Sequence, residues 1–95
     1  YVIGLVDDLA AAHLPPDLLP PYELLEVSRI GIPDFAGMGK RYDITELNTA
    51  VKPFFIDFFF RELPEAERVI YFDPDIIVFQ PLDHLSRNLD TYSIV

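Results

Sequence analysis

The sequence has no cysteine and few basic residues, and each shortage excludes a class of function. With no cysteine among its 95 residues, the chain forms neither disulfide bonds nor thiolate metal sites, although this leaves its compartment open. Only 7 lysines and arginines accompany 16 aspartates and glutamates, so the formal net charge is −9. Because no basic cluster is present to neutralise phosphates, we expect no nucleic-acid partner.

Long hydrophobic runs are also missing. The longest covers residues 53–60, is interrupted by Asp57, and is far too short to span a bilayer. No signal peptide is recognisable either, because Tyr1 starts within an apolar run that has no basic flank. We therefore expect a cytoplasmic protein with no membrane span.

The size and composition indicate one small, folded domain. Hydrophobic residues make up 51% of the chain and aromatic residues 14%, which argues against disorder. Residues 1–6 and 92–95 both read as strand segments, whereas a self-contained domain usually begins and ends in polar surface chain. We therefore predict that residues 1–95 are a single partial domain, a fragment of a larger α/β domain.

The most informative stretch is residues 68–81, which read RVIYFDPDIIVFQP. Its apolar residues are rich in β-branched and aromatic types, which predicts a strand buried on both faces. Residues two apart in an extended chain point the same way, so Asp73 and Asp75 should project together from the strand's end. Pro74 favours an extended conformation at Asp73.

Such a pair of aspartates is expected either to share a proton or to bind a cation. At about 5 Å, two carboxylates repel by roughly 3 kcal/mol at an effective dielectric constant near 20. A hard divalent ion, Mn²⁺ or Mg²⁺, takes oxygen ligands and usually shares them with substrate phosphates. The simpler alternative is that Asp73 and Asp75 only end the strand in solvent.

Other patterns predict further strands and helices, and together they indicate the fold class. The clearest helix begins at Asp43, where Glu46 completes a capping box, and Pro53 should kink or restart it. The order of elements predicts an open, mostly parallel sheet with flanking helices, in which ligands bind beyond the carboxyl ends of the strands. We expect strands at residues 1–6, 22–27 and from 91 onward, one helical turn near 34–38, a short helix over 83–88 capped by Asp83, and no helix among the prolines of 15–21.

Two further polar features bear on function. Lys52 is a lone cation on the otherwise apolar helix, and a diphosphate leaving group needs a divalent metal and preferably a nearby lysine or arginine. Asp7 and Asp8 follow the first strand. The alternatives are that Lys52 is an ordinary solvated lysine and that the aspartates only end their strand.

With these residues in place, a family resemblance becomes visible. Residues 69–85 read VIYFDPDIIVFQPLDHL, which resembles the vlYLDaDiiv…pldeL signature of nucleotide-sugar glycosyltransferases with the GT-A fold, especially the family-8-like retaining enzymes. Residues 42–60, YDITELNTAVKPFFIDFFF, look like the helix before that signature in a bacterial branch. The likeness extends over most of the chain and is most specific over residues 42–85.

The resemblance implies a metal-dependent hexosyltransferase, of which residues 1–95 form the central part of an incomplete, Rossmann-like GT-A domain. It implies that Asp73 contacts the donor ribose and the metal, that Asp75 binds the metal, and that Lys52 contacts the nucleotide-sugar. The implied donor is a UDP-sugar and the cofactor Mn²⁺ or Mg²⁺. The acceptor (carbohydrate, lipid or protein) and the catalytic residue stay unknown, and neither His13 nor His84 matches the family's metal-binding histidine.

Because parts of the donor and acceptor sites would be missing, we expect residues 1–95 alone to be inactive. Two other functions stay open. The chain could be a non-catalytic interaction module that forms homo-oligomers through exposed phenylalanines and unpaired strand edges. It could also be a metal-dependent nucleotidyltransferase-like domain, since sheets of this type carry unrelated chemistries.

Overall fold

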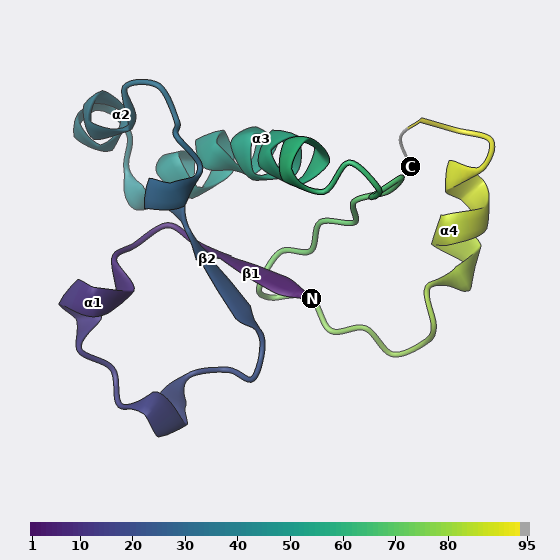
Figure 1. Cartoon of the computed structure of the whole chain (residues 1–95), viewed down its shortest axis with the longest axis horizontal. Helices are drawn as coiled ribbons and strands as arrows, with labels where there is room; N and C mark the ends of the chain where they lie inside the picture. The colour runs from purple at the N-terminus through teal and green to yellow at the C-terminus, as the bar shows by residue number, and fades with distance from the viewer. Residues whose placement is uncertain (94–95) are drawn as a thin grey trace.

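A pair of parallel strands and one long helix form the centre of the molecule (Figure 1). The computed structural model describes residues 1–93. The strands are β1 (Val2–Leu5) and β2 (Glu23–Glu26), and the long helix is α3 (Ile44–Glu62). The shorter elements are α1 (Leu9–Ala12), the 3₁₀ helices η1 (Pro16–Leu18) and η2 (Val27–Arg29), α2 (Phe35–Arg41) and α4 (Asp83–Leu89).

The two strands are compatible with the expected α/β class, but the sheet is smaller than predicted. β1 and β2 pair in parallel, with Val2 opposite Glu23 and Leu5 opposite Glu26. Both strands lie within the predicted ranges 1–6 and 22–27. Among the described residues the sheet has two strands, so the structure is a small mixed fold compatible with the α/β class.

The connection between the strands contains more helix than the sequence predicted. Asp8 caps α1 by accepting hydrogen bonds from the backbone of Ala10 and Ala11. The prolines do exclude an α-helix from residues 15–21, but Pro16 occupies the first position of the 3₁₀ helix η1, where a proline needs no N–H.

Helix α3 begins as the sequence predicted. The Asp43 carboxylate accepts a hydrogen bond from the Glu46 N–H at 2.8 Å, and the Glu46 carboxylate accepts one from the Asp43 N–H at 3.0 Å. Pro53 lies inside the helix, which continues through it to Glu62. Proline thus removes one backbone donor without ending the helix.

Helix α2 is longer than the single turn predicted near residues 34–38. It extends to Arg41, whose guanidinium pairs with the Asp34 carboxylate at 3.1 Å. Asp34 precedes the helix with a left-handed backbone (φ 54°), a conformation that aspartate adopts more readily than most residues.

The hydrophobic core lies between β2, the segment after it, and the helices α2 and α3. Val51 of α3 and Leu25 of β2 are its most buried members, at 1% and 2% exposure. Strand β1 also lies close to α3, because a Cβ at Gly4 would come within 2.9 Å of the Phe55 ring. The buried residues are Leu25, Val27, Ile30, Ile32, Met38, Val51 and Phe55.

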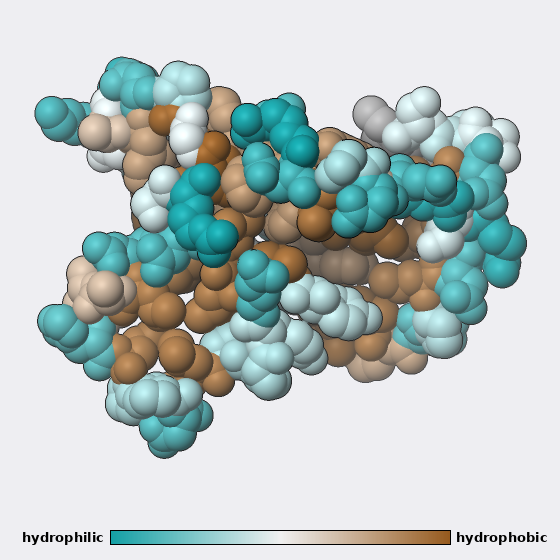
Figure 2. Space-filling model, in the orientation of Figure 1, coloured by the Kyte–Doolittle hydropathy of each residue, from teal (hydrophilic) through white to brown (hydrophobic). Residues whose placement is uncertain are grey.

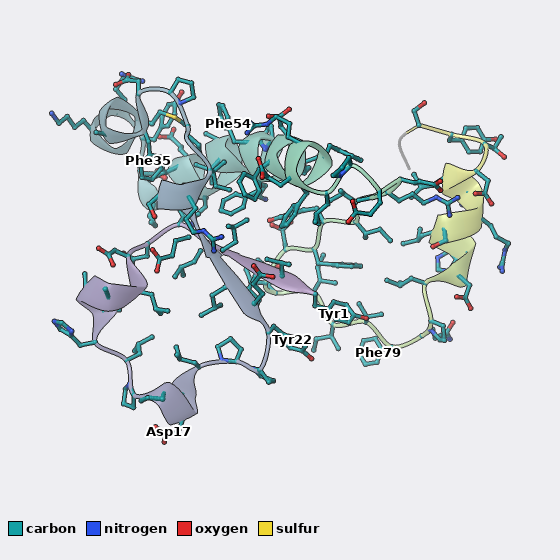
Figure 3. All side chains as sticks on the ribbon, viewed as in Figure 1. Tyr1, Asp17, Tyr22, Phe35, Phe54 and Phe79 are labelled. Carbon is teal, nitrogen blue, oxygen red and sulfur yellow. The ribbon has the colours of Figure 1, made fainter. Side chains whose placement is uncertain are left out.

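The strand predicted within residues 68–81 is wrong. The structure assigns no strand there, and the segment is not buried: Ile77 is 74% exposed and Phe79, labelled in Figure 3, is 87% exposed. A strand needs a neighbour for its N–H and C=O groups. Within the described residues β1 and β2 pair only with each other, so this segment has no partner.

The C-terminal part differs from prediction in two more respects. Helix α4 forms close to the predicted range, but its N-cap is Leu82, and Asp83 is the first helical residue rather than the cap. The predicted last strand is absent from residues 91–93, and its remaining residues, 94–95, lie outside the described part.

The molecule is less compact than expected for a chain of its length. Its radius of gyration is 15.2 Å, against about 12.4 Å expected for a compact chain of this size. In Figure 1, α4 stands apart from the sheet and α3, and in Figure 2 hydrophobic residues gather below α3 while its outward side is largely hydrophilic. None of the helices in residues 1–93 combines the length and apolar character needed to cross a membrane.

Candidate functional site

Lys52 and Asp73, which lie 21 positions apart in the sequence, are in direct contact. The Lys52 ammonium donates a hydrogen bond to Oδ1 of Asp73 at 2.7 Å. The Tyr71 hydroxyl donates to the same oxygen, also at 2.7 Å. Lys52 Nζ also lies 4.9 Å from the centre of the Tyr71 ring, within the range of a cation–π contact. The three side chains form one polar cluster.

Two separate elements supply this cluster. Lys52 projects from α3, next to the buried Val51 and just before Pro53, so the helix core fixes the base of its side chain. Tyr71 and Asp73 come from the segment after α3 and are two residues apart, a spacing that puts side chains on the same side of extended chain. The Lys52 and Asp73 side chains are 30% and 46% exposed, so a ligand can reach them.

The contact shifts the pKa of each group in the direction of a stable ion pair. The hydrogen bond to Asp73, followed by the nearby Tyr71 hydroxyl, raises the pKa of Lys52. The same hydrogen bond from Lys52, with that from Tyr71, lowers the pKa of Asp73. Partial burial is the largest cause of the raised pKa of Tyr71, and its hydrogen bond to Asp73 adds to it. Near neutral pH, Lys52 is therefore cationic and Asp73 anionic.

The backbone at the aspartate pair is a turn, which corrects the extended geometry that the sequence predicted there. The Ile76 N–H donates to the Asp73 carbonyl at 3.1 Å, closing a four-residue turn around Pro74 and Asp75. Proline at the second position suits such a turn, because its φ is already fixed near the required value. Alternation along a strand therefore does not direct both carboxylates the same way here.

The carboxylate oxygens of this segment that accept no hydrogen bond from a described residue are compatible with binding a divalent ion. No described residue donates a hydrogen bond to Oδ2 of Asp73 or to the Asp75 carboxylate, and carboxylate oxygens are ligands that Mg²⁺ and Mn²⁺ accept. Within residues 1–93, no group of three or more histidine, cysteine, aspartate or glutamate side chains is gathered closely enough to hold a metal. A metal here would take its further ligands from water or substrate phosphates, as Mg²⁺ usually does.

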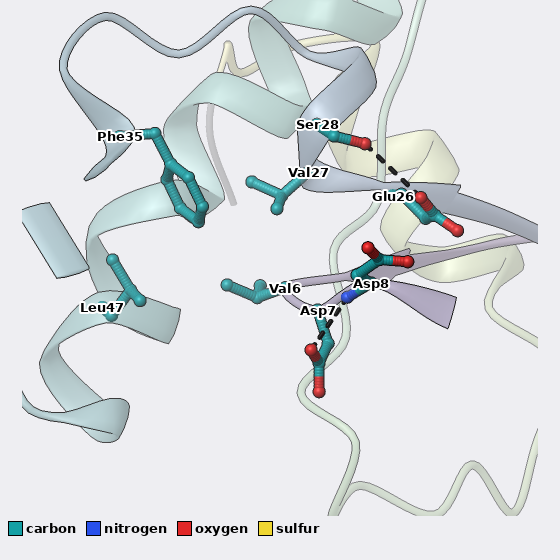
Figure 4. Close-up of a pocket in the computed structure, with 8 residues that line it drawn as sticks. All are labelled: Val6, Asp7, Asp8, Glu26, Val27, Ser28, Phe35 and Leu47. Atoms are coloured by element: carbon teal, nitrogen blue, oxygen red, sulfur yellow. Dashed lines mark hydrogen bonds between the residues drawn. The ribbon is translucent and has the colours of Figure 1, made fainter. Parts of the chain in front are cut away.

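A second feature lined by acidic residues is a pocket at the carboxyl ends of β1 and β2 (Figure 4). It is a hollow of about 430 Å³ between the strand ends and the helices α2 and α3. One side is apolar and the other is polar, with Ser28 Oγ donating to Glu26 at 3.4 Å. The lining residues are Val6, Asp7, Asp8, Glu26, Val27, Ser28, Phe35 and Leu47.

The acids of this hollow already have structural roles. Asp8 caps α1, and Asp7 accepts a hydrogen bond from the Asp8 N–H at 2.8 Å. They follow β1 directly, which agrees with the interpretation that they end a strand. The sequence analysis did not single out Glu26 and Ser28, and only the parallel pairing of β2 with β1 brings them to the same edge.

The other residues considered from sequence lie on separate elements. His13 ends α1 with a left-handed backbone (φ 49°), and His84 lies in α4. Tyr71 is the one member of the polar cluster that the sequence analysis did not single out. Its position two residues before Asp73, in chain expected to be extended, was the available signal.

Comparison with known proteins leaves the family of this chain open. No family model, curated protein or solved structure matches it. Its function is therefore inferred from its residues and their geometry.

Proposed function

We propose that the protein is a metal-dependent glycosyltransferase that binds a nucleoside-diphosphate sugar, with a UDP-sugar as the donor, through Asp73, Asp75 and Lys52. One observation supports this above all: Lys52 Nζ lies 2.7 Å from Oδ1 of Asp73. These are two residues to which the sequence resemblance assigns one donor site, and they come from elements far apart in the sequence. The ion pair gives Lys52 a contact within the proposed site that a fully solvated lysine on α3 would lack.

The charges of the cluster suit a diphosphate bound together with a divalent ion. Lys52, Asp73 and Asp75 carry one positive and two negative charges, so the site is net negative and attracts a cation. A divalent ion makes the site net positive, and it then attracts a diphosphate. When bound, Mn²⁺ or Mg²⁺ would supply stabilisation of the charge that develops on the leaving diphosphate.

Each residue has a distinct part in this scheme. Asp73 and Asp75 would hold the ion through carboxylate oxygens, and Lys52 would donate hydrogen bonds to the departing diphosphate. The exposure of Lys52 and Asp73 allows a substrate to approach from solvent. No residue is assigned as nucleophile or base, and the acceptor is undefined.

Calorimetric titration tests the proposal. Mn²⁺ is titrated into the protein first and UDP second, in the unmodified protein and in a variant that combines Asp73→Asn with Asp75→Asn. We expect the double variant to lose metal-dependent UDP binding. Asp17→Asn, which changes an exposed aspartate in η1, should bind like the unmodified protein. Unchanged binding by the double variant would refute the assignment.

Activity assays separate sugar transfer from the related nucleotidyl transfer. Because residues 1–95 alone are expected to be inactive, this assay uses the longer protein of which they are expected to be a part. In that protein, a radiolabelled sugar supplied as its UDP derivative should be released or transferred in the presence of Mn²⁺. A nucleotidyltransferase would instead transfer label from a nucleoside triphosphate, and this result would reassign the site.

A non-catalytic interaction module is the second candidate, because apolar side chains of the segment after α3 are exposed. Ile77 and Phe79 are the most exposed of these. In this case the protein would form homo-oligomers, and sedimentation would show the same assembly with and without Mn²⁺. Metal-indifferent assembly together with no UDP binding would favour this function over sugar transfer.

A further inference from the structure

We propose that Tyr71 is a positioning residue for Asp73. Tyr71 and Lys52 both hydrogen-bond to Oδ1 of that carboxylate, so that Asp73 binds a divalent ion through Oδ2 alone. The inference rests on the proposed function, because the ion is that of the donor site. It adds Tyr71 to the site and gives Lys52 a role before any nucleotide binds.

Two donors share one acceptor atom, Oδ1 of Asp73. The Tyr71 hydroxyl and the Lys52 ammonium each lie 2.7 Å from Oδ1, while no described residue donates to Oδ2. The two donors come from different elements, so they restrain the carboxylate from two sides. A neutral hydrogen-bond partner such as the Tyr71 hydroxyl orients a metal-binding carboxylate, and losing such a partner typically costs about 10–100-fold in metal affinity. Lys52 restrains the same oxygen, but its positive charge opposes the ion.

The exposure of Tyr71 does not fit a role in core packing. Its side chain is 45% exposed, and it lies outside the hydrophobic core. Its contacts are polar: the hydroxyl donates to Asp73, and the ring lies below the Lys52 ammonium. A surface aromatic without a function would not be expected to contact both charged members of the proposed site.

The positive charge of Lys52 also affects the binding of the ion. While Lys52 is paired with Asp73, its positive charge lies beside the position of the incoming ion and repels it. Removing that charge should strengthen the binding of metal alone, and it should weaken the binding of UDP to the metal-loaded protein because a phosphate donor is lost. A lysine that serves only structure would not change the two affinities in opposite directions.

Mn²⁺ binding without nucleotide, followed by the electron paramagnetic resonance signal of free Mn²⁺, tests the proposal. Tyr71→Phe keeps the ring and removes the hydroxyl, and it should weaken Mn²⁺ binding about tenfold, as the loss of an orienting partner typically does. Tyr42→Phe is the matched control, because Tyr42 is similarly exposed and its hydroxyl makes no hydrogen bond within residues 1–93. It should bind Mn²⁺ like the unmodified protein.

Two further variants complete the test. Lys52→Met should bind Mn²⁺ several-fold more tightly and UDP more weakly, whereas Lys40→Met, on α2, should change neither affinity. Thermal unfolding of Tyr71→Phe and Tyr42→Phe should be alike. The proposal is overturned if Tyr71→Phe binds Mn²⁺ normally, if it melts well below Tyr42→Phe, or if Lys52→Met loses Mn²⁺ affinity.

Failure of this inference can be told apart from failure of the proposed function. If Asp73→Asn abolishes Mn²⁺ binding but Tyr71→Phe does not affect it, the metal site stands and the positioning role is wrong. If Asp73→Asn binds Mn²⁺ as the unmodified protein does, the proposed site itself is wrong.

Discussion

Residues 1–62 and residues 63–93 are both rich in apolar side chains, but only the first part buries them. All seven residues of the core lie in the first part, contributed by β2, the segment after it, α2 and α3. In the second part no described residue is buried. The difference shows that an apolar sequence becomes a core only where another element supplies the facing surface.

An ion pair connects the two parts. Lys52 of α3 pairs with Asp73, as described above. Within the second part, Arg68 donates to the Ser86 carbonyl at 3.1 Å and pairs with Asp90, which ties the segment after α3 to α4. The proposed site therefore lies where the well-packed part meets the open one.

The largest expected difference between the parts is the cost of deleting a hydrophobic side chain. Leu25→Ala should lower the free energy of unfolding by about 2–5 kcal/mol, because Leu25 is almost fully buried and its loss leaves a cavity. Ile77→Ala should change it by less than about 0.5 kcal/mol, because most of that side chain is in solvent. Urea denaturation measures both values. Equal losses would show that residues 63–93 are packed after all.

A smaller effect is expected where β1 approaches α3. Gly4→Ala places a Cβ 2.9 Å from the Phe55 ring, and overpacking of this kind costs about 1–3 kcal/mol. Gly39→Ala, in α2, meets nothing within 4 Å and should stabilise the protein by about 0.5–1 kcal/mol. Thermal unfolding of the two variants should therefore shift in opposite directions. A shift in the same direction would contradict the close approach of β1 to α3.

Helix capping gives a third, smaller contrast. Asp43→Ala removes the capping box of α3 and should cost about 0.5–2 kcal/mol. Asp83→Ala removes an acidic residue that caps nothing in α4, and it should cost less. Urea denaturation compares them, and a larger loss for Asp83→Ala would mean that α4 is the more important helix for stability.

The smallest effect is the dependence of stability on pH. The pKa of Asp73 is lowered from 3.8, so its pairing with Lys52 stabilises the fold above that pH and stops doing so as pH falls through the lowered value. The pKa of Lys52 is raised from 10.5, so its contribution is lost only as pH rises above that raised value.

Lys52→Met should therefore be slightly less stable than the unmodified protein at pH 7, and the difference should disappear in strong acid. Denaturation midpoints measured from pH 7 down to pH 2 test this, with Lys40→Met as the control. A stability difference that persists at pH 2 would show that Lys52 stabilises the fold by packing rather than by pairing with Asp73.

The sequence predicted those features that depend on nearby residues. The capping box at Asp43 and the strands at residues 1–6 and 22–27 formed as expected, because capping and strand propensity are local properties. Helix α4 formed for the same reason. The parallel pairing of the two strands also agrees with the predicted class.

The sequence could not predict features that depend on distant partners. The strand expected within residues 68–81 has the right composition, but its formation depends on a neighbouring strand. The turn at Pro74 did have a signal in the sequence, because proline followed by aspartate is typical of turns. The contact between Lys52 and Tyr71 could not be predicted, because it depends on the path of the chain between these two residues.

The most direct test of the proposed metal site is to locate bound Mn²⁺ by its broadening of backbone amide signals in nuclear magnetic resonance spectra. Acidic residues gather both around Asp73 and Asp75 and in the pocket at the strand ends, so the result discriminates between these two regions. We predict that, at low Mn²⁺, the amide signals of residues 71–73, 75 and 76 broaden first while those of Asp7, Asp8 and Glu26 stay sharp. Broadening that begins at the strand ends, or that is uniform along the chain, would contradict the assignment of Asp73 and Asp75 as the metal site.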